Sequence, residues 1–115
     1  MRIAHVCPYD PNRHGGVQRN MHALVAALAS RGHQTLVVAP GVADPREEGV
    51  LRLGGMRSVR FAETRFEVTW AADDKLESAA RLLRTWRADV VHFHTPWDPL
   101  MPWQLFRRLD MARVA

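Results

Sequence analysis

Short apolar runs alternate with one amphipathic segment along the first forty residues. Residues 3–7 are mostly apolar and stop at a proline, which is typical of a buried central strand. From Val17 the apolar residues recur at the one-face spacing of a helix, which Gly32 closes. Residues 34–39 then form a second apolar, β-branched run. Strand, helix and strand with short connections predict a βαβ unit whose two strands are parallel.

The second half of the chain repeats this alternation after an interval that is harder to interpret. Short extended segments are expected at residues 50–53, 58–61 and 66–70. A helix is predicted from Asp74, with Glu77 three residues later as a capping-box-like pair, until it ends at residues 88–89. The remaining predicted elements are a buried-type strand, a last helix and the start of another strand: residues 90–94, from 99 or 100 to 109, and 112–115.

This order predicts the fold class and points to where a ligand would bind. Alternating strands and helices indicate an α/β domain, a Rossmann-like, doubly wound and mainly parallel sheet, and the length suits one domain over residues 1–115. Ligands of such sheets bind beyond the carboxyl ends of the strands, at the topological switch point. Two proline-rich loops, residues 8–16 and 95–99, follow predicted strands. We expect the function to reside in these loops.

Charge and cysteine content narrow the environment of the protein. The formal charge is +4, and Lys75 is the single lysine among sixteen cationic residues, so the positive charge is nearly all arginine. These charges are scattered, which predicts a solvated surface and no nucleic-acid partner. Cys7 has no partner for an internal disulfide and is expected to be a small buried residue. With no apolar run of signal-peptide or membrane-spanning type, we expect a cytoplasmic protein.

The paired glycines Gly15 and Gly16 precede a predicted helix. Such a turn brings backbone N–H groups and the positive end of the helix dipole to a phosphate, although a plain tight turn explains the pair equally well. Several nucleotide-binding classes are excluded. The chain has neither a Gly-x-Gly-x-x-Gly turn after the first strand nor a Gly-Lys-Ser/Thr loop, and it lacks the acidic cluster and late lysine of a receiver domain.

Three histidines offer another chemistry. His92 and His94 lie two apart on a predicted strand and so point to one face, and His5 lies on a strand that could be adjacent. A three-histidine zinc site is one interpretation. We favour neutral histidines bonded to the backbone or to a carboxylate, and therefore predict no metal site. Two tryptophans near prolines, Trp97 and Trp103, suit either stacking on a sugar or packing at the rim of the sheet.

Taken together, four segments resemble a known family. These segments, residues 1–9, 14–19, 31–40 and 88–94, resemble the N-terminal domain of GT-B fold, family 4 glycosyltransferases. Within that family the sequences Cys-Pro-Tyr and Gly-Gly-Val-Gln resemble the phosphatidylinositol mannosyltransferases. The resemblance implies the N-terminal half of a GT-B architecture. It also implies retaining transfer of a sugar from a nucleotide-sugar donor, which is a substrate, with no cofactor and no metal.

The resemblance further implies roles for residues in the two loops. The glycine turn and the start of the next helix would bind the donor, through Gly15, Gly16, Gln18 and Arg19. The two proline-rich loops, residues 8–16 and 95–99, would face a lipid or glycan acceptor. The residues concerned are Tyr9, Asp10, Thr95, Pro96 and Trp97. In membrane-acting relatives basic residues meet anionic lipid, which predicts a peripheral contact at the inner face of the membrane through Arg52, Arg57, Arg60, Arg65, Arg81 and Arg84.

Two features of the family are absent from these residues. A second Rossmann-like domain with a Glu-x7-Glu motif normally holds the donor nucleotide, and the family's catalytic histidine is expected beyond Ala115. We therefore expect an N-terminal piece of an enzyme, with no turnover by residues 1–115 alone. A non-catalytic module that binds phosphate or a nucleotide-sugar, and a scaffold without ligand, are the competing interpretations.

Overall fold

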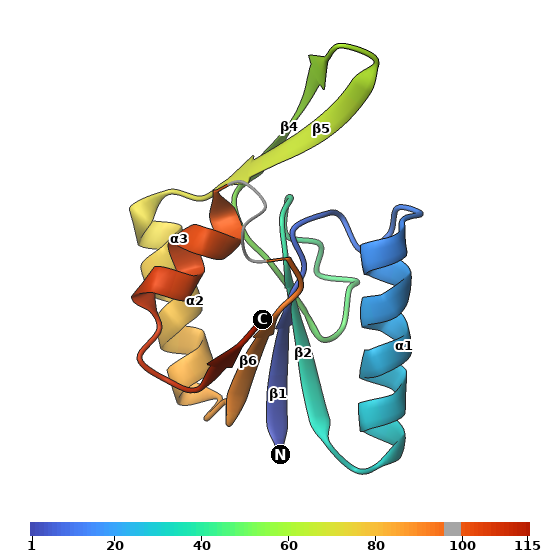
Figure 1. Ribbon diagram of the computed structural model, residues 1–115. Helices are drawn as coiled ribbons and strands as arrows, with labels where there is room; N and C mark the ends of the chain where they lie inside the picture. The colour runs from blue at the N-terminus through green and yellow to red at the C-terminus, as the bar shows by residue number, and fades with distance from the viewer. Residues whose placement is uncertain (96–99) are drawn as a thin grey trace.

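The computed structural model describes residues 1–95 and 100–115. Figure 1 shows the chain from its blue N-terminus to its red C-terminus. The elements in chain order are β1 (Arg2–Val6), α1 (Gly16–Ser30), β2 (Gln34–Ala39), β3 (Val50–Arg52), β4 (Gly55–Phe61), β5 (Thr64–Trp70), α2 (Asp73–Thr85), β6 (Val90–Phe93), α3 (Met101–Arg108) and β7 (Arg113–Val114).

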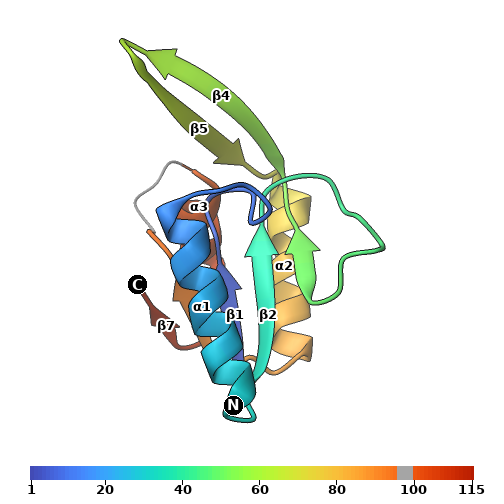
Figure 2. The ribbon, with the colours of Figure 1, turned by 90° about the vertical axis from the view of Figure 1, so that its right-hand side faces the viewer.

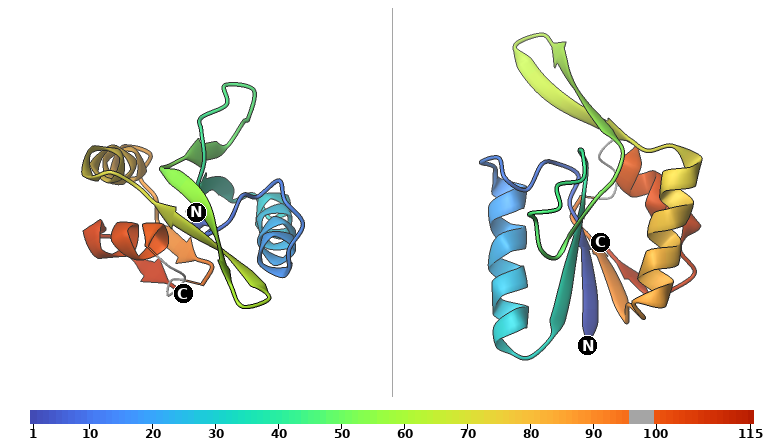
Figure 3. Two further views of the ribbon diagram at one scale, coloured as in Figure 1. Left: turned by 90° about the horizontal axis from the view of Figure 1, so that it is seen from above. Right: turned by 180° about the vertical axis from the view of Figure 1, so that it is seen from behind.

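Five strands form one parallel sheet in the order β3-β2-β1-β6-β7. Helix α1 lies on one face of this sheet, and helices α2 and α3 lie side by side on the other (Figures 1 and 3). The predicted Rossmann-like, doubly wound α/β fold is therefore confirmed. The direction of strand order reverses between β1 and β6, and this is the switch point at which such sheets bind ligands.

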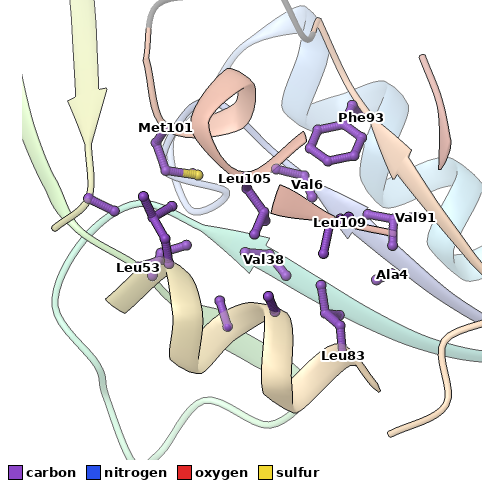
Figure 4. Close-up of a cluster of buried hydrophobic side chains, with 14 residues drawn as sticks. Ala4, Val6, Val38, Leu53, Leu83, Val91, Phe93, Met101, Leu105 and Leu109 are labelled. Atoms are coloured by element: carbon purple, nitrogen blue, oxygen red, sulfur yellow. The ribbon is translucent and has the colours of Figure 1, made fainter. Parts of the chain in front are cut away.

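The alternation of side chains along the strands divides the core into two layers. Ala4 and Val6 on β1 and Val91 and Phe93 on β6 belong to the larger apolar cluster, which packs against α2 and α3 (Figure 4). A smaller cluster around Cys7, with Met21 of α1, fills the other face. Because side chains two residues apart share a face, the odd positions of β1 and the even positions of β6 point to the side of α1.

Strands β4 and β5 form an antiparallel hairpin that projects away from the sheet (Figures 1 and 2). The sequence predicted extended segments here, which is confirmed, but it predicted neither their length nor their pairing. The two-residue connection at Ala62 has a positive φ of 55° without the glycine or asparagine that normally reveals a hairpin turn. At the base of the hairpin, Gly54 has a φ of 77°, and a Cβ there would lie 1.8 Å from the Trp70 carbonyl oxygen.

The predicted capping box at the start of α2 is wrong. The helix begins one residue earlier, and its N-cap is Ala72, whose extended backbone is capped by no side chain of the described residues. Asp73 and Asp74 both lie in the first turn, where their charges complement the helix dipole. Asp73 also accepts a hydrogen bond of 2.6 Å from Arg108, which ties α2 to α3. Asp73 thus makes a contact between the two helices.

Candidate functional site

The loop after β1 and the first turns of α1 surround an open hollow of about 640 Å³. It is lined by residues 11–16, Gln18, Arg19 and His22. We call it the glycine-turn hollow. It brings together all four residues that the sequence analysis assigned to the donor, at the N-terminus of a 15-residue helix with no acidic residue in its first turn. The positive end of the helix dipole is therefore not neutralised by the helix itself.

The two glycines of the turn differ in their surroundings. Gly15 has an extended backbone, and a Cβ there would lie 2.2 Å from Oε1 of Gln18. Apart from its chain neighbours and the backbone of its own helix, a Cβ on Gly16 would meet no atom of the described residues within 4 Å. Packing against Gln18 accounts for the glycine at position 15. The protein's own packing does not require the second glycine, and the space beside it is open.

Gln18 supports the loop as well as lining the hollow. Gln18 is only 7% exposed, and its Nε2 donates a hydrogen bond of 3.3 Å to the carbonyl oxygen of Asp10. Arg19, the next residue, is exposed. His22, one turn further along α1, donates from Nε2 to the carbonyl oxygen of Pro11 at 2.8 Å. The sequence analysis missed His22, because its spacing from the loop is visible only once the loop folds back over the helix.

The Asp10 carboxylate is held by the protein itself. Its Oδ1 accepts hydrogen bonds from Nη1 of Arg52 and from the backbone N–H of Asn12, both at 3.1 Å. Arg52 also donates from Nε and Nη2 to the two carboxylate oxygens of Glu47, each at 2.9 Å, and from Nη1 to the Pro40 carbonyl oxygen. These contacts, chiefly those with Glu47, raise the pKa of Arg52 above its usual value.

The prediction that Arg52 faces lipid is therefore wrong. Its side chain is 7% exposed and locks β3 to the loop after β1. The physical reason is that three acceptors converge on one planar guanidinium, which matches their directions. Arg57 and Arg60 on the hairpin and Arg81 and Arg84 on α2 are exposed, as a surface contact requires. The side chain of Arg65 lies outside the described set.

The residues predicted to face the acceptor lie in two loops that begin at the ends of adjacent strands. The backbone N–H of His94 donates to the carbonyl oxygen of Val6 at 3.0 Å, so the loops after β1 and β6 begin side by side. Tyr9 is partly buried against the smaller apolar cluster. Thr95 has a positive φ of 59°, and its hydroxyl donates to the His94 carbonyl oxygen. Pro96 and Trp97 lie outside the described residues.

Three histidines meet beside this edge of the sheet. The parallel register pairs His5 of β1 with His92 of β6, and His94 follows on the same side of the strand. Nδ1 of His5 lies 3.2 Å from Nε2 of His94, and the rings of His92 and His94 are stacked with centroids 4.2 Å apart. We call these residues the histidine trio. For His5 and His94, the bond between them replaces the backbone or carboxylate partner that the sequence favoured.

Burial keeps the histidine trio neutral. It lowers the pKa of His5 and of His94 to about 4, and repulsion from neighbouring rings of the trio adds to the effect. Burial alone lowers the pKa of His92. His5 is fully buried, and its Nε2 has no hydrogen-bond partner among the residues that the structure describes. Near neutral pH the trio therefore presents uncharged imidazoles with unshared electron pairs.

Cys7 lies on the same face of β1 as His5 but takes no part in this cluster. Its side chain is fully buried, as predicted, in the smaller apolar cluster beneath α1. Burial raises the pKa of its thiol to about 11. A thiol that stays protonated is a poor nucleophile, so Cys7 is not a candidate nucleophile at this edge.

Comparison with known proteins identifies the family of the chain. The family model for Glycosyltransferase Family 4 matches residues 14–115. A phosphatidyl-myo-inositol mannosyltransferase of Propionibacterium freudenreichii subsp. shermanii is 31% identical over 106 residues, which cover 86% of this chain and 28% of that protein. A second, from Mycobacterium leprae, is 31% identical over 109 residues, which cover 91% of this chain and 28% of that protein.

The family match begins at residue 14, near the end of the loop after β1, and includes α1, β6 with His92, and His94. The chain spans little more than a quarter of the length of these relatives. None of the helices among the described residues is long and apolar enough to cross a membrane. On the strength of the family match and of the two relatives, the chain belongs to glycosyltransferase family 4.

Proposed function

We propose that this chain is the N-terminal, acceptor-side half of a retaining glycosyltransferase, which moves a sugar from a nucleotide-sugar to a lipid or glycan acceptor. The observation that carries the proposal is the open space beside Gly16 at the N-terminus of α1. Glycine at this position lets a diphosphate approach backbone N–H groups that the helix leaves unpaired. The hollow at this point is large enough for such a group.

The charges around the glycine-turn hollow favour an anionic ligand. Arg13 and Arg19 line it, and the first turn of α1 contributes no carboxylate that would repel a phosphate. Arg13 forms an ion pair with Glu67 of the hairpin, so Arg19 is the cation that we assign to the donor. Gln18 acts by holding the loop through Asp10. The donor is a substrate, and the proposed transfer uses neither cofactor nor metal.

The acceptor side of the proposal rests on the loops after β1 and β6, which begin next to one another. Both relatives are phosphatidyl-myo-inositol mannosyltransferases, and their names support a lipid acceptor bearing a sugar-like headgroup. Exposed arginines on the hairpin and on α2 would hold the enzyme peripherally on anionic lipid at the cytoplasmic face. A second, C-terminal Rossmann-like domain would complete the donor site, and residues 1–115 alone would not turn over.

The decisive experiment compares donor binding by the unsubstituted protein and by the variants Gly16→Val and Ala23→Val, each joined to the rest of its natural chain. Gly16→Val fills the open space, whereas Ala23→Val adds the same branched side chain at an exposed position of α1 outside the hollow. Calorimetric titration with nucleotide-diphosphate sugars, followed by an assay of sugar release and transfer, is expected to show loss of both with Gly16→Val only. Equal behaviour of the two variants would contradict the donor role of the glycine turn.

If the unsubstituted protein binds the donor but transfers no sugar, the result would favour a non-catalytic binding module over a glycosyltransferase. Residues 1–115 by themselves provide the second arm of the experiment. We expect no transfer from them, because the donor nucleotide lacks its second wall. Sugar transfer by this piece would contradict the division of the site between two domains.

A further inference from the structure

We propose that the histidine trio, His5, His92 and His94, binds one divalent transition-metal ion, with zinc the best match, at the switch point of the sheet. This proposal replaces the prediction from sequence that the chain has no metal site. It concerns an ion bound to the fold and assigns that ion no step in sugar transfer. It is therefore independent of the proposed function.

The geometry of the trio is close to that of a bound ion. One ring nitrogen from each histidine can be chosen so that all three lie within 4.8 Å of one another. Nδ1 of His5 and Nε2 of His94 are 3.2 Å apart. Two nitrogens that bind one tetrahedral zinc at 2.0–2.1 Å are separated by about 3.3–3.4 Å, so the separation of this pair already matches, and the two rings need only turn toward a shared ion. A rotation of the half-buried His92 ring brings in the third ligand.

The backbone holds this arrangement in place. His5 and His92 are direct partners in the parallel β1–β6 register, and the backbone N–H of His94 is bonded to Val6 of β1. Two adjacent strands in the middle of the sheet therefore supply two of the rings, and the residue directly after β6 supplies the third. A site on rigid strands loses little conformational freedom when an ion binds, which favours affinity.

The state without an ion leaves hydrogen-bonding capacity unused. Nδ1 of His5 and Nε2 of His94 share one hydrogen bond, and these are the two nitrogens that the ion would take; Nε2 of His5 is buried without a partner among the described residues and stays so. A cation shared by three rings replaces one weak contact with three coordinate bonds.

The donor set selects the class of metal. Imidazole nitrogens suit zinc, copper, nickel and iron, whereas magnesium and calcium prefer carboxylate and carbonyl oxygens. No carboxylate belongs to the cluster in the described part of the chain. Three protein ligands leave a fourth position, which water can occupy because His92 and His94 are only partly buried. We therefore expect zinc to bind and magnesium not to bind.

Equilibrium dialysis of the untagged, chelator-treated chain against zinc, with a chromogenic chelator as competitor, tests the proposal. We expect one zinc per folded chain, and roughly tenfold or greater loss of affinity in both His92→Ala and His94→Ala. The matched control is His33→Ala, which removes a partly buried histidine outside the trio. Circular dichroism verifies that each variant is folded. Zinc should raise the thermal midpoint of the unsubstituted chain and of His33→Ala only.

Two further measurements address His5, whose complete burial makes its substitution a risk to folding. Cobalt should give the visible bands of a tetrahedral ion without a thiolate charge-transfer band, because Cys7 is not a ligand. Nitrogen NMR should show coordination shifts on three histidine rings when zinc is added. Absence of stoichiometric zinc uptake by the folded chain, or its retention in both His92→Ala and His94→Ala, would overturn the proposal.

Discussion

Nδ1 of His5 lies 3.2 Å from Nε2 of His94, although the two residues are 89 positions apart in the chain. The contact joins β1 to the segment just after β6 at the point where strand order reverses. The two loops that leave this edge are therefore anchored to one another before either meets a ligand. Changes to one loop are expected to reach the other through this edge, and the predictions below separate structural from ligand-related roles.

Gly15→Ala and Gly16→Ala should differ in stability. The new methyl at position 15 meets Gln18, which must then give up its hydrogen bond to the Asp10 carbonyl, so we expect a loss of about 1–2 kcal/mol. The methyl at position 16 enters open space at the start of a helix, where alanine changes stability by less than about 1 kcal/mol. Urea unfolding measures both. An equal loss in the two variants would contradict this account of the glycine turn.

Arg52→Met should destabilise the fold by about 2–3 kcal/mol. It removes the cation from a buried position and leaves Glu47 and Asp10 without their shared partner, both of which are only partly exposed. The control is Arg46→Met, because the Arg46 side chain is 88% exposed and its pair with Asp44 lies at the surface, where it should contribute little to stability. Thermal and urea unfolding compare the two. A small effect at Arg52 would mean that the loop after β1 is held by other contacts.

Gly54→Ala should loosen the hairpin from the body of the protein. A Cβ at this position collides with the backbone of Trp70, and the positive φ adds strain, so we expect a loss above about 2 kcal/mol. Gly49→Ala is the control, because it has a similar φ of 69° but no atom within 4 Å of the added Cβ, and should lose about 1 kcal/mol.

Hydrogen exchange at the amides of β4 and β5 locates the effect. Faster exchange confined to the hairpin in Gly54→Ala is the expected result. Unchanged protection in that variant would show that the base of the hairpin tolerates a side chain.

The Cys7 thiol should stay unreactive in the folded protein at mildly alkaline pH. Burial raises its pKa to about 11, so the folded state favours the protonated thiol. The contribution of this group to stability is complete below the pKa of the unfolded thiol and is lost as pH rises from about 9 towards 11. Thiol titration with a disulfide reagent at pH 8 to 9 should be slow without urea and immediate in urea. Rapid labelling of the native chain would contradict the burial of this residue.

Local patterns were sufficient for most of the fold. The residues of β1, β2 and β6 were recognisable as short apolar runs, and α1 as a periodic apolar face between Val17 and Gly32. These signals depend on side chains a few positions apart. The same reasoning was wrong at α2, where an acid near the first turn was taken for a cap, and it missed the hairpin pairing of β4 with β5, whose turn lacks a typical residue.

The sequence predicted only part of the candidate site. The family resemblance and the glycine pair pointed to the loop after β1, and the structure gathers Gly15, Gly16, Gln18 and Arg19 around one hollow. Their donor role stays a prediction. The burial of Arg52 against three acceptors was invisible, because two of them come from separate loops that meet only in the folded chain.

The sequence by itself determined the order of elements, the parallel α/β class and the positions of the two loops, because hydrophobic period, glycine and proline act over a few residues. Only the tertiary structure decided that β1 and β6 are neighbours with His5 opposite His92, since pairing in a sheet is a choice among strands distant in the chain. That choice, together with burial, turns three separate histidines into one neutral cluster.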